Sequence, residues 1–277
     1  MTRPSLRPLA EAAPGDFAHV DVVLTDMDDT LTFNGRLAAQ TYSALERLHA
    51  DGVRIVPITA APAGWCDQMA RMWPITAVIG ENGGFCFWRR GETLERRFWL
   101  DAKGRSDAQY RLAEIAADIR QSHPEVALAD DQPFRQSSVA FARPSDRDTA
   151  AAVVEAFEAA GARATLNAIW ALGWLGAYDK IISARTFLPE AIGIDIDADL
   201  DRIVFVGDSA NDAPMFAHVR KSAGVSTVTE HLSDIPRHPA WITRGPGGDG
   251  FVEVADAILA ARARRIPRPA RSTARHS

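Results

Sequence analysis

The 277-residue sequence has few cysteines, few lysines and no long apolar segment. Its only cysteines, Cys66 and Cys86, could pair, but so small a number indicates reduced thiols and a cytoplasmic setting. No apolar run approaches the roughly 20 residues of a membrane span. Residues 1–19 also lack the apolar stretch of a signal peptide. We therefore expect neither a membrane partner nor a disulfide scaffold.

An excess of positive charge is also missing. The formal net charge is −5 and the isoelectric point is about 5.8, which argues against a nucleic-acid partner for the chain as a whole. Of the 31 basic residues, only Lys103, Lys180 and Lys221 are lysines. Because arginine is the usual cation here, each lysine is a candidate for a specific role.

One stretch, residues 22–32, reads Val-Val-Leu-Thr-Asp-Met-Asp-Asp-Thr-Leu-Thr. Its apolar start predicts a buried strand, and Asp26, Asp28 and Asp29 follow at once. Such crowded carboxylates repel one another, and their pKa values rise unless a cation lies among them. Mg²⁺ prefers oxygen ligands of this kind. A solvated acidic turn is the alternative that this stretch alone leaves open.

The first third of the chain alternates between strand and helix patterns. A strand at 53–58 follows a helix that begins near Leu37, and Pro57 predicts a strand end or a bulge because proline cannot donate to a ladder. Pro62 opens the next helix, and a strand at 77–79 follows. This alternation predicts a parallel sheet with crossover helices.

The pattern changes at Gly84 and returns to the first one at Tyr178. Between these residues we expect an α+β insert. Its predicted elements are a hairpin of strands 85–90 and 93–100, helices near 105–121 and 146–160, and strands near 125–129, 136–142, 162–167 and 169–174. After it we expect a helix from Lys180, a strand at 203–206 and a final helix at about 250–263.

This pattern divides the chain into a core that is interrupted by one insert. The predicted core comprises 18–84 and 178–262, and the insert comprises 85–177. Residues 1–17 and 263–277 are expected to be flexible tails. The second tail is rich in arginine, which is typical of a solvated end but also leaves contact with nucleic acid or acidic lipid open.

Polar side chains stand at the predicted strand ends and helix starts of the core. Because parallel strands end at one edge of a sheet, these side chains can converge there. Together they supply carboxylates, an ammonium group, a hydroxyl and an amide, which suit a metal-bound phosphoryl group. The residues are Asp26, Asp28, Thr59, Lys180 and the run Gly207-Asp208-Ser209-Ala210-Asn211-Asp212.

In these motifs the chain resembles the haloacid dehalogenase-like superfamily of phosphohydrolases. Residues 26–30 match its first motif, Asp-x-Asp-x-Thr, Thr59 its second, Lys180 its third and residues 207–212 its fourth. The resemblance covers roughly 20–260. It implies an α/β fold, with a Rossmann-like parallel-sheet core and an α+β cap that resembles the type IIB cap. That branch includes Cof-type sugar-phosphate phosphatases and sucrose-, trehalose- and mannosyl-phosphoglycerate phosphatases.

The resemblance also implies roles for individual residues. Asp26 would be the nucleophile that forms an aspartyl-phosphate, and Asp28 would be the general acid and base. Thr59, Lys180 and Asn211 would bind the phosphoryl oxygens. Taken singly, Thr59 could be a capping residue, Lys180 a surface charge and Asn211 a turn residue.

The metal implied by the resemblance is Mg²⁺. The carboxylates of Asp26 and Asp208 and the backbone carbonyl of Asp28 would hold it, with Asp212 in support. A small phosphorylated substrate is the expected partner. The sequence leaves the oligomeric state open.

The second motif departs from the family pattern. Relatives often read Thr-Gly-Arg, whereas this chain has Ala60 and Ala61 after the threonine. Either another arginine, such as Arg135 of the cap, replaces the missing one, or the substrate differs. Trp170 is a further candidate for substrate contact, although packing in the cap is the simpler role for it. Asn167 and Trp65 are weaker candidates.

The resemblance implies a Mg²⁺-dependent phosphatase that acts on a small phosphorylated metabolite, a sugar or sugar-acid phosphate. A phosphomutase of the same superfamily is an alternative enzyme. A phosphoaspartate receiver is the non-enzymatic alternative, because it also uses acids, threonine and lysine at a sheet edge. The insert and Asp28 argue against a receiver, and Asp28 also argues against a true dehalogenase, whose leaving halide needs no proton.

Overall fold

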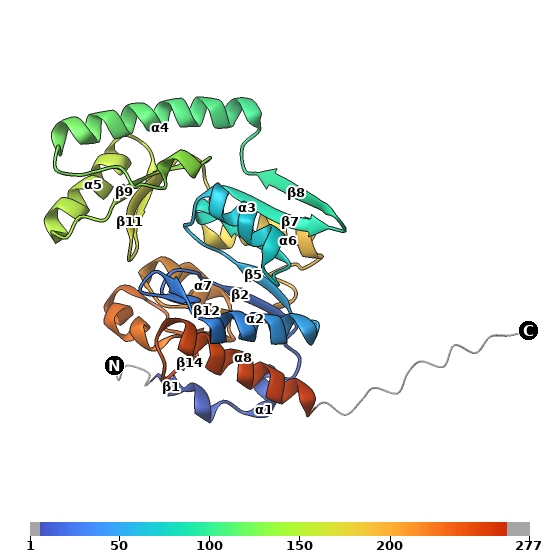
Figure 1. Ribbon diagram of the computed structural model, residues 1–277. Coiled ribbons are helices and arrows are strands. Elements are labelled where there is room, and N and C mark those ends of the chain that lie inside the picture. Colours follow the sequence, from blue (N-terminus) through green and yellow to red (C-terminus); the bar gives the residue numbers. More distant parts are fainter. Residues whose placement is uncertain (1–5, 265–277) are drawn as a thin grey trace, which may run out of the picture.

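The computed structural model describes residues 6–264, and a six-stranded, all-parallel sheet lies at its centre (Figure 1). The spatial order is β1-β14-β13-β12-β2-β5. The strands are β1 (Arg7–Pro8), β2 (Val22–Thr25), β5 (Arg54–Pro57), β12 (Ile203–Gly207), β13 (Ser222–Gly224) and β14 (Trp241–Ile242). The prediction of a parallel α/β core is therefore confirmed.

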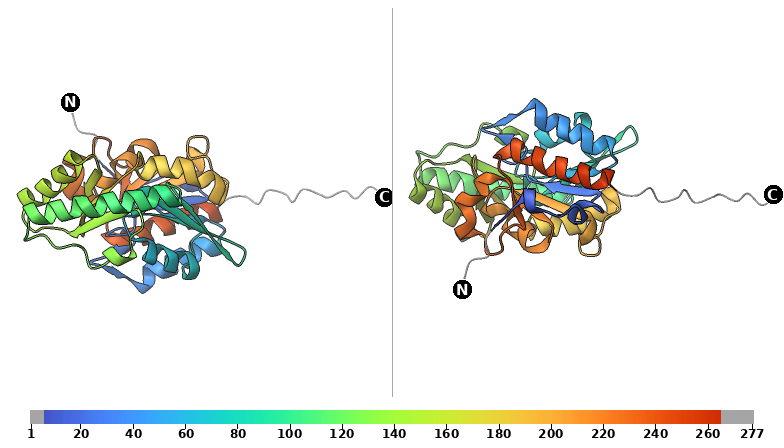
Figure 2. Two further views of the ribbon diagram at one scale, coloured as in Figure 1. Left: turned by 90° about the horizontal axis from the view of Figure 1, so that it is seen from above. Right: turned by 90° about the horizontal axis from the view of Figure 1, so that it is seen from below.

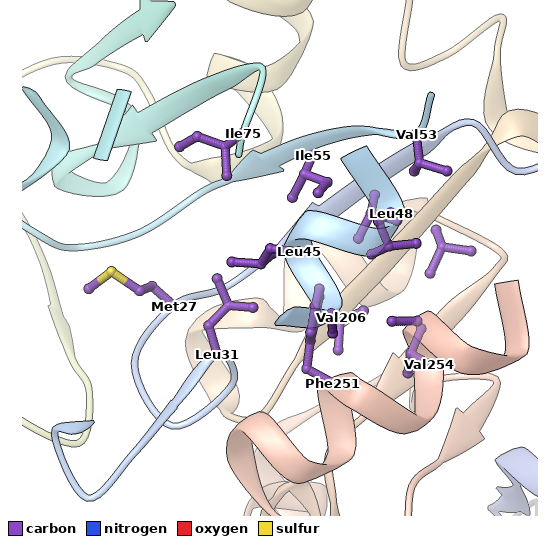
Figure 3. Close-up of a cluster of buried hydrophobic side chains, with 14 of the residues drawn as sticks. Met27, Leu31, Leu45, Leu48, Val53, Ile55, Ile75, Val206, Phe251 and Val254 are labelled. Carbon is purple, nitrogen blue, oxygen red and sulfur yellow. The ribbon is translucent and has the colours of Figure 1, made fainter. Parts of the chain in front are cut away.

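Helices cover both faces of this sheet because its central strands are apolar on both sides. Val23 of β2 belongs to a buried cluster that includes side chains of α1 (Pro14–Phe17), α2 (Ala39–Ala50), α3 (Ala63–Met72) and α8 (Gly247–Ala263). Its neighbour Val22 faces the other way and packs with α6 (Lys180–Ile192) and α7 (Ala213–His218). Figure 3 shows the first of these clusters, in which Leu45 and Leu48 of α2 approach Phe251 and Val254 of α8.

Strand β6 (Ala77–Gly80) runs beside β5, but Pro57 interrupts the hydrogen-bond ladder between them. Thr76 donates to the carbonyl of Ile55, and Thr59 donates to that of Ile79. Pro57 lies between these bonds and has no N–H to offer. The expectation that Pro57 ends its strand is confirmed, since β5 stops at this residue.

The hairpin of β7 (Phe85–Arg90) and β8 (Thr93–Phe98) corrects the predicted domain boundary. β7 pairs antiparallel with β6 as well as with β8, so the hairpin extends the core. Phe85 and Phe87 pack in the same cluster as Val78 and Cys66. The sequence showed a hairpin but could not show that its partner was the preceding core strand.

The cap itself is a three-stranded antiparallel sheet with two helices on one face (Figures 1 and 2). Its elements are α4 (Ala102–Ser122), β9 (Ser138–Ala142), α5 (Arg147–Ala159), β10 (Arg163–Leu166) and β11 (Trp170–Trp174). The strand expected at 125–129 is only a single bridge between Leu128 and Phe141. The uncovered face of the sheet meets the core, where Ala140 and Trp170 pack with Ala60.

Residues 7–17 are ordered, which corrects the expectation of a flexible N-terminal tail for them. β1 joins the edge of the sheet beside β14, and Leu9 is buried. Phe17 of α1 is also buried, and its ring lies 5.0 Å from that of Trp241. These elements are too short to leave a periodic signal in the sequence. Residues 265–277, which contain most of the arginine-rich tail, lie outside the described residues.

Across residues 6–264, no helix combines the length and the apolar character that a membrane crossing requires.

Candidate active site

Two acidic strand ends lie next to each other at the carboxyl edge of the core sheet. Asp26 follows β2 and Asp208 follows β12, and these strands are direct neighbours in the sheet. The N–H of Asp26 donates to the carbonyl of Val206, at 2.9 Å. After the acids the chain turns through Asp29, which has a φ of 55°, into the short pair β3 (Thr32–Phe33) and β4 (Arg36–Leu37). The parallel topology therefore brings together residues that are far apart in the sequence.

Three buried carboxylates meet at this edge. Asp26, Asp208 and Asp212 each offer an oxygen within 4.8 Å of the others. Burial, reinforced by the charges of Asp26 and Asp212, raises the pKa of Asp208 to about 9. Burial also raises the pKa of Asp26 to about 6, although Lys180 opposes the shift. Without a further cation, the cluster therefore keeps protons that free carboxyl groups would lose.

Lys180 is the ammonium group of this cluster. It is the first residue of α6, whose N-cap Asp179 accepts a hydrogen bond from Ile182. Its Nζ lies 2.9 Å from Asp26 Oδ1 and 2.6 Å from Asp212 Oδ1. Burial alone would lower the pKa of Lys180, but these two carboxylates outweigh it and raise the pKa. Lys180 is therefore a buried cation at the acidic edge.

The two oxygens of Asp212 have different partners. Oδ1 accepts from Lys180, whereas Oδ2 accepts from the backbone N–H groups of Asp208 and Ser209. The turn needs Gly207, because a Cβ there would lie 2.4 Å from Asp212 Oδ2. Asp212 thus fixes the loop and the lysine together, which fits a supporting position.

The donor set fits a hard divalent cation. The Asp26 and Asp208 carboxylates are buried close together, and within residues 6–264 the one ammonium group that pairs with the three acids is that of Lys180. Thr30 donates to Asp208 Oδ1 at 2.9 Å and orients this carboxylate. Oxygen ligands alone, without histidine or thiolate, are typical of Mg²⁺.

Asp28 lies between the acidic cluster and a cavity. Burial, with the nearby charges of Asp26 and Asp29, raises its pKa to about 8. The cavity has a volume of about 340 Å³, and Trp65 and Trp73 contribute aromatic walls to it. A carboxyl group with so high a pKa holds a proton at neutral pH and can give it to a group in this cavity.

Thr59 and Asn211 flank the cluster on different loops. Thr59 follows β5, which pairs with β2, so it lies at the sheet edge next to the end of Asp26's strand. Its Oγ1 accepts from the N–H of Ala61, at 3.0 Å. The side-chain oxygen of Asn211 lies 3.4 Å from Lys180 Nζ. The structure thus places both residues at the edge where the sequence predicted them.

Arg135 reaches the second motif from the cap, but protein groups engage its guanidinium. It donates to both carboxylate oxygens of Asp131, at 2.9 and 3.1 Å, and to the carbonyl of Ala60, at 3.0 Å. The guanidinium also lies 4.6 Å from the ring centre of Trp170. Both side chains are buried, and neither lines the cavity beside Asp28. This geometry favours a bridge between cap and core over direct substrate contact.

Sequence reasoning missed the role of Glu81, where the chain passes from the core towards the cap. Its carboxylate is fully buried and accepts from the N–H of Ala63 in α3. From the cap it accepts the N–H groups of Gln136 and Ser137 and the hydroxyl of Ser138. The Glu-Asn-Gly-Gly run at 81–84 marked the entrance to the insert, but no local pattern reveals donors 55–57 positions away.

The chain matches no family model and no curated protein. Its fold, however, matches solved structures. One is a haloacid dehalogenase-like hydrolase of Bacteroides thetaiotaomicron, with a TM-score of 0.61 at 13% sequence identity over 86% of this chain and 99% of that one. The chain has the fold of a haloacid dehalogenase-like hydrolase.

Two further structures share this fold. A protein of Thermoplasma acidophilum gives a TM-score of 0.67 at 18% identity, over 87% of this chain and 98% of that one. The sucrose-phosphatase of Synechocystis, solved with sucrose and phosphate, gives a TM-score of 0.61 at 12% identity, over 87% of this chain and 98% of that one. Because the matches span nearly all of each neighbour, the likeness extends beyond the central sheet.

Proposed function

We propose that this protein is a Mg²⁺-dependent phosphatase that hydrolyses a small phosphorylated metabolite through an aspartyl-phosphate. The observation that carries the proposal is the buried contact of Lys180 Nζ with Asp26 Oδ1, inside an acidic cluster and near Asp28, whose pKa burial raises. A purely structural ion pair has no need of three crowded carboxylates. A site for a phosphoryl group and its metal ion needs both kinds of charge, because the carboxylates bind the metal ion and the ammonium group binds the phosphoryl oxygens.

In the proposed reaction, a carboxylate oxygen of Asp26 attacks phosphorus and the bond from phosphorus to the ester oxygen breaks. Asp28 gives its proton to the departing oxygen, consistent with a pKa of about 8. Water then attacks the aspartyl-phosphate while the Asp28 carboxylate takes a proton from it. Inorganic phosphate leaves, and the Asp26 carboxylate is restored.

The other residues would stabilise charge on the phosphoryl group. Lys180, the hydroxyl of Thr59 and the amide of Asn211 would bind its oxygens. The carboxylates of Asp26 and Asp208, with the backbone carbonyl of Asp28, would hold Mg²⁺, and Asp212 would support Lys180 and the loop. When bound, the metal supplies positive charge that neutralises the phosphoryl oxygens.

The cavity beside Asp28 supports a sugar or sugar-acid phosphate as substrate. Trp65 and Trp73 offer flat apolar surfaces for the C–H face of a sugar ring, and Gln68 and Thr32 offer polar groups. Structures of similar fold include a sucrose-phosphatase and a trehalose-6-phosphate phosphatase related protein. Arg135 and Trp170 would influence substrate choice indirectly, by holding the cap sheet against Ala60.

The same proposal covers the partners and the compartment. We expect a small phosphorylated substrate, with neither nucleic acid nor a membrane as a partner. Cys66 and Cys86 are buried and unpaired, which supports a reducing, cytoplasmic setting.

The test is a phosphate-release screen over sugar and nucleotide phosphates, with Mg²⁺ in one arm and EDTA in the other. We expect release from a subset of sugar phosphates that stops with EDTA. Activity that EDTA leaves unchanged would remove the metal from the proposal. An isomeric phosphate ester formed without phosphate release would indicate a phosphomutase instead.

A further inference from the structure

The side-chain amide of Asn82 is buried without a hydrogen-bond partner. Asn82 is only 4% exposed, yet neither Nδ2 nor Oδ1 is bonded to any protein group. Buried amides are nearly always paired, because an unpaired one loses its bonds to water and gains nothing in return. The preceding residue shows the contrast, since the Glu81 carboxylate accepts from four donors. A ligand is the simplest partner for a polar group kept unpaired in this way.

The backbone holds Asn82 at the second motif. Its N–H donates to the carbonyl of Thr59, at 2.9 Å, and the N–H of Glu81 donates to that of Ala61, at 3.1 Å. The φ of Asn82 is 56°, a left-handed conformation that asparagine tolerates better than most residues do. Gly83 follows with a φ of 117°, and a Cβ there would lie 1.9 Å from the Ser183 hydroxyl. Tight local packing therefore fixes the position of the amide.

Asn82 lines a second cavity, which shares no lining residue with the aromatic one beside Asp28. This cavity has a volume of about 250 Å³ and shares its lining with Lys180, Asn211 and Arg163. Two of these residues are cations. Asn82 thus lines the same space as two of the three proposed phosphate-binding residues, and its backbone N–H donates to the carbonyl of the third, Thr59.

We propose that Asn82 is a substrate-binding residue whose Nδ2–H group donates to an oxygen of the phosphoryl group. This inference rests on the proposed phosphatase site and adds a donor from the turn between β6 and β7 to it. Asn82 lies beside the segment in which Ala60 and Ala61 offer no side-chain donor. It therefore supplies, from a different loop, a contact that the second motif of this chain cannot make.

Two substitutions test the amide while respecting the backbone. Asn82→Gly removes the amide, and glycine adopts a positive φ readily. Asn82→Asp keeps the shape but replaces the donor by an anionic oxygen. Asn34→Gly is the matched control, because Asn34 also has a positive φ of 50° but is exposed. Binding of inorganic phosphate with Mg²⁺ present is measured by calorimetry for each protein, together with its melting temperature.

Asn82→Gly should weaken phosphate binding by about tenfold or more, as expected for one hydrogen bond to a charged acceptor. Asn82→Asp should weaken it further, because two anions then face each other. Asn34→Gly should bind phosphate as the wild type does. In turnover, KM should rise more than kcat falls, since the contact is present both before and during the reaction.

Wild-type affinity for phosphate in Asn82→Gly and Asn82→Asp would overturn the inference and leave the proposed function standing. If Asn82→Gly melts far below the wild type, its loss of phosphate binding could reflect unfolding. The phosphate affinity of Asn82→Asp, measured where its melting temperature is unchanged, then decides the question. A wild-type protein that hydrolyses no ester, but whose phosphate binding depends on Asn82, would overturn the proposed function and keep this inference. A wild type with no affinity for phosphate overturns the inference, and the activity screen then judges the function separately.

Discussion

Two clusters of buried charge in this protein differ in how completely the protein satisfies them. Where the cap meets the core, Glu81 accepts four hydrogen bonds, and Arg135 pairs with Asp131 and a core carbonyl. We call this cluster the seam. At the sheet edge, three carboxylates meet one ammonium group, and the pKa values of Asp26 and Asp208 are raised. Satisfied charge joins parts of a fold, whereas excess charge of one sign indicates a site for a charged ligand.

The largest expected effect follows from Asp26→Asn at the sheet edge. Without the nucleophile, turnover should fall by about 10⁴-fold or more. The melting temperature should not fall, because the change removes one of three crowded acids while Lys180 keeps Asp212. Phosphate release and a thermal melt measure both effects, and Asp107→Asn at an exposed ion pair is the control. Activity near the wild-type level would refute the nucleophile assignment.

Asp28→Asn should have the next largest effect, and it should depend on the leaving group. Loss of the proton shuttle should lower the rate on a sugar phosphate by about 10² to 10⁴-fold. With nitrophenyl phosphate the first step needs little protonation, so the protein should show a burst of nitrophenol and accumulate an aspartyl-phosphate. Intact mass should show the added phosphoryl group, and Asp26→Asn should lack it. Equal rates for Asp28→Asn and wild type on both esters would contradict the acid/base role.

Stabilisation by Mg²⁺ can distinguish the sheet edge from the seam without a measurement of enzymatic activity. A cation that neutralises the sheet edge should raise the free energy of unfolding by about 2.7 kcal/mol at a Mg²⁺ concentration 100 times its Kd. Asp208→Asn should abolish this increase. Glu81→Gln, at the seam, should retain it. Thermal melts over a Mg²⁺ titration measure the effect, and an equal response of all three proteins would place the metal elsewhere.

The seam should respond to mutation mainly in stability. Glu81→Gln turns an acceptor of four hydrogen bonds into a group with an NH₂ that faces backbone donors, so the free energy of unfolding should fall by about 1–3 kcal/mol. Turnover of nitrophenyl phosphate at a temperature where the variant is folded should change only a few-fold. Denaturant unfolding measures the free energy of unfolding, and steady-state kinetics measure the turnover. A loss of turnover as large as that of Asp28→Asn would show that the seam takes part in the chemistry.

The smallest effect is expected at Trp65, which is 40% exposed beside the aromatic cavity. Trp65→Leu should lower kcat/KM for sugar phosphates by about 2–10-fold, the value of one aromatic contact. Ethyl phosphate, which has no ring to stack, should be affected less. Tyr110→Leu on the far side of the cap is the control, since Tyr110 is an exposed aromatic outside that cavity. The same loss on every ester would argue against stacking.

The residues of the sheet edge were predictable because each follows a strand or begins a helix. Asp26 comes directly after an apolar run, and Lys180 follows Asp179, an N-cap residue type. Once the strands are recognised as parallel, their ends must share one edge, and the convergence follows from topology. The roles of these residues in catalysis remain predictions until the variants above are measured.

The seam and the second cavity were not predictable in this way. Glu81 and Asn82 were visible only as part of a turn-like run, and the left-handed conformation of Glu81, with a φ of 47°, leaves no mark on residue identity. The partners of Glu81 come from residues 136–138, whose positions depend on how the cap docks. The hairpin after Gly84 was predicted as a local pair, but its pairing with β6 depends on which edge the core leaves open.

The sequence by itself determined the parallel core, the presence of an insert and the set of chemical groups at the sheet edge. These depend on local periodicity and on the fixed direction of parallel strands. Only the tertiary structure decided that Glu81 is satisfied while the amide of Asn82 beside it is not, and that Arg135 bonds to the protein. Such differences arise from contacts between distant segments, and two neighbouring polar residues with similar sequence surroundings can therefore have opposite environments.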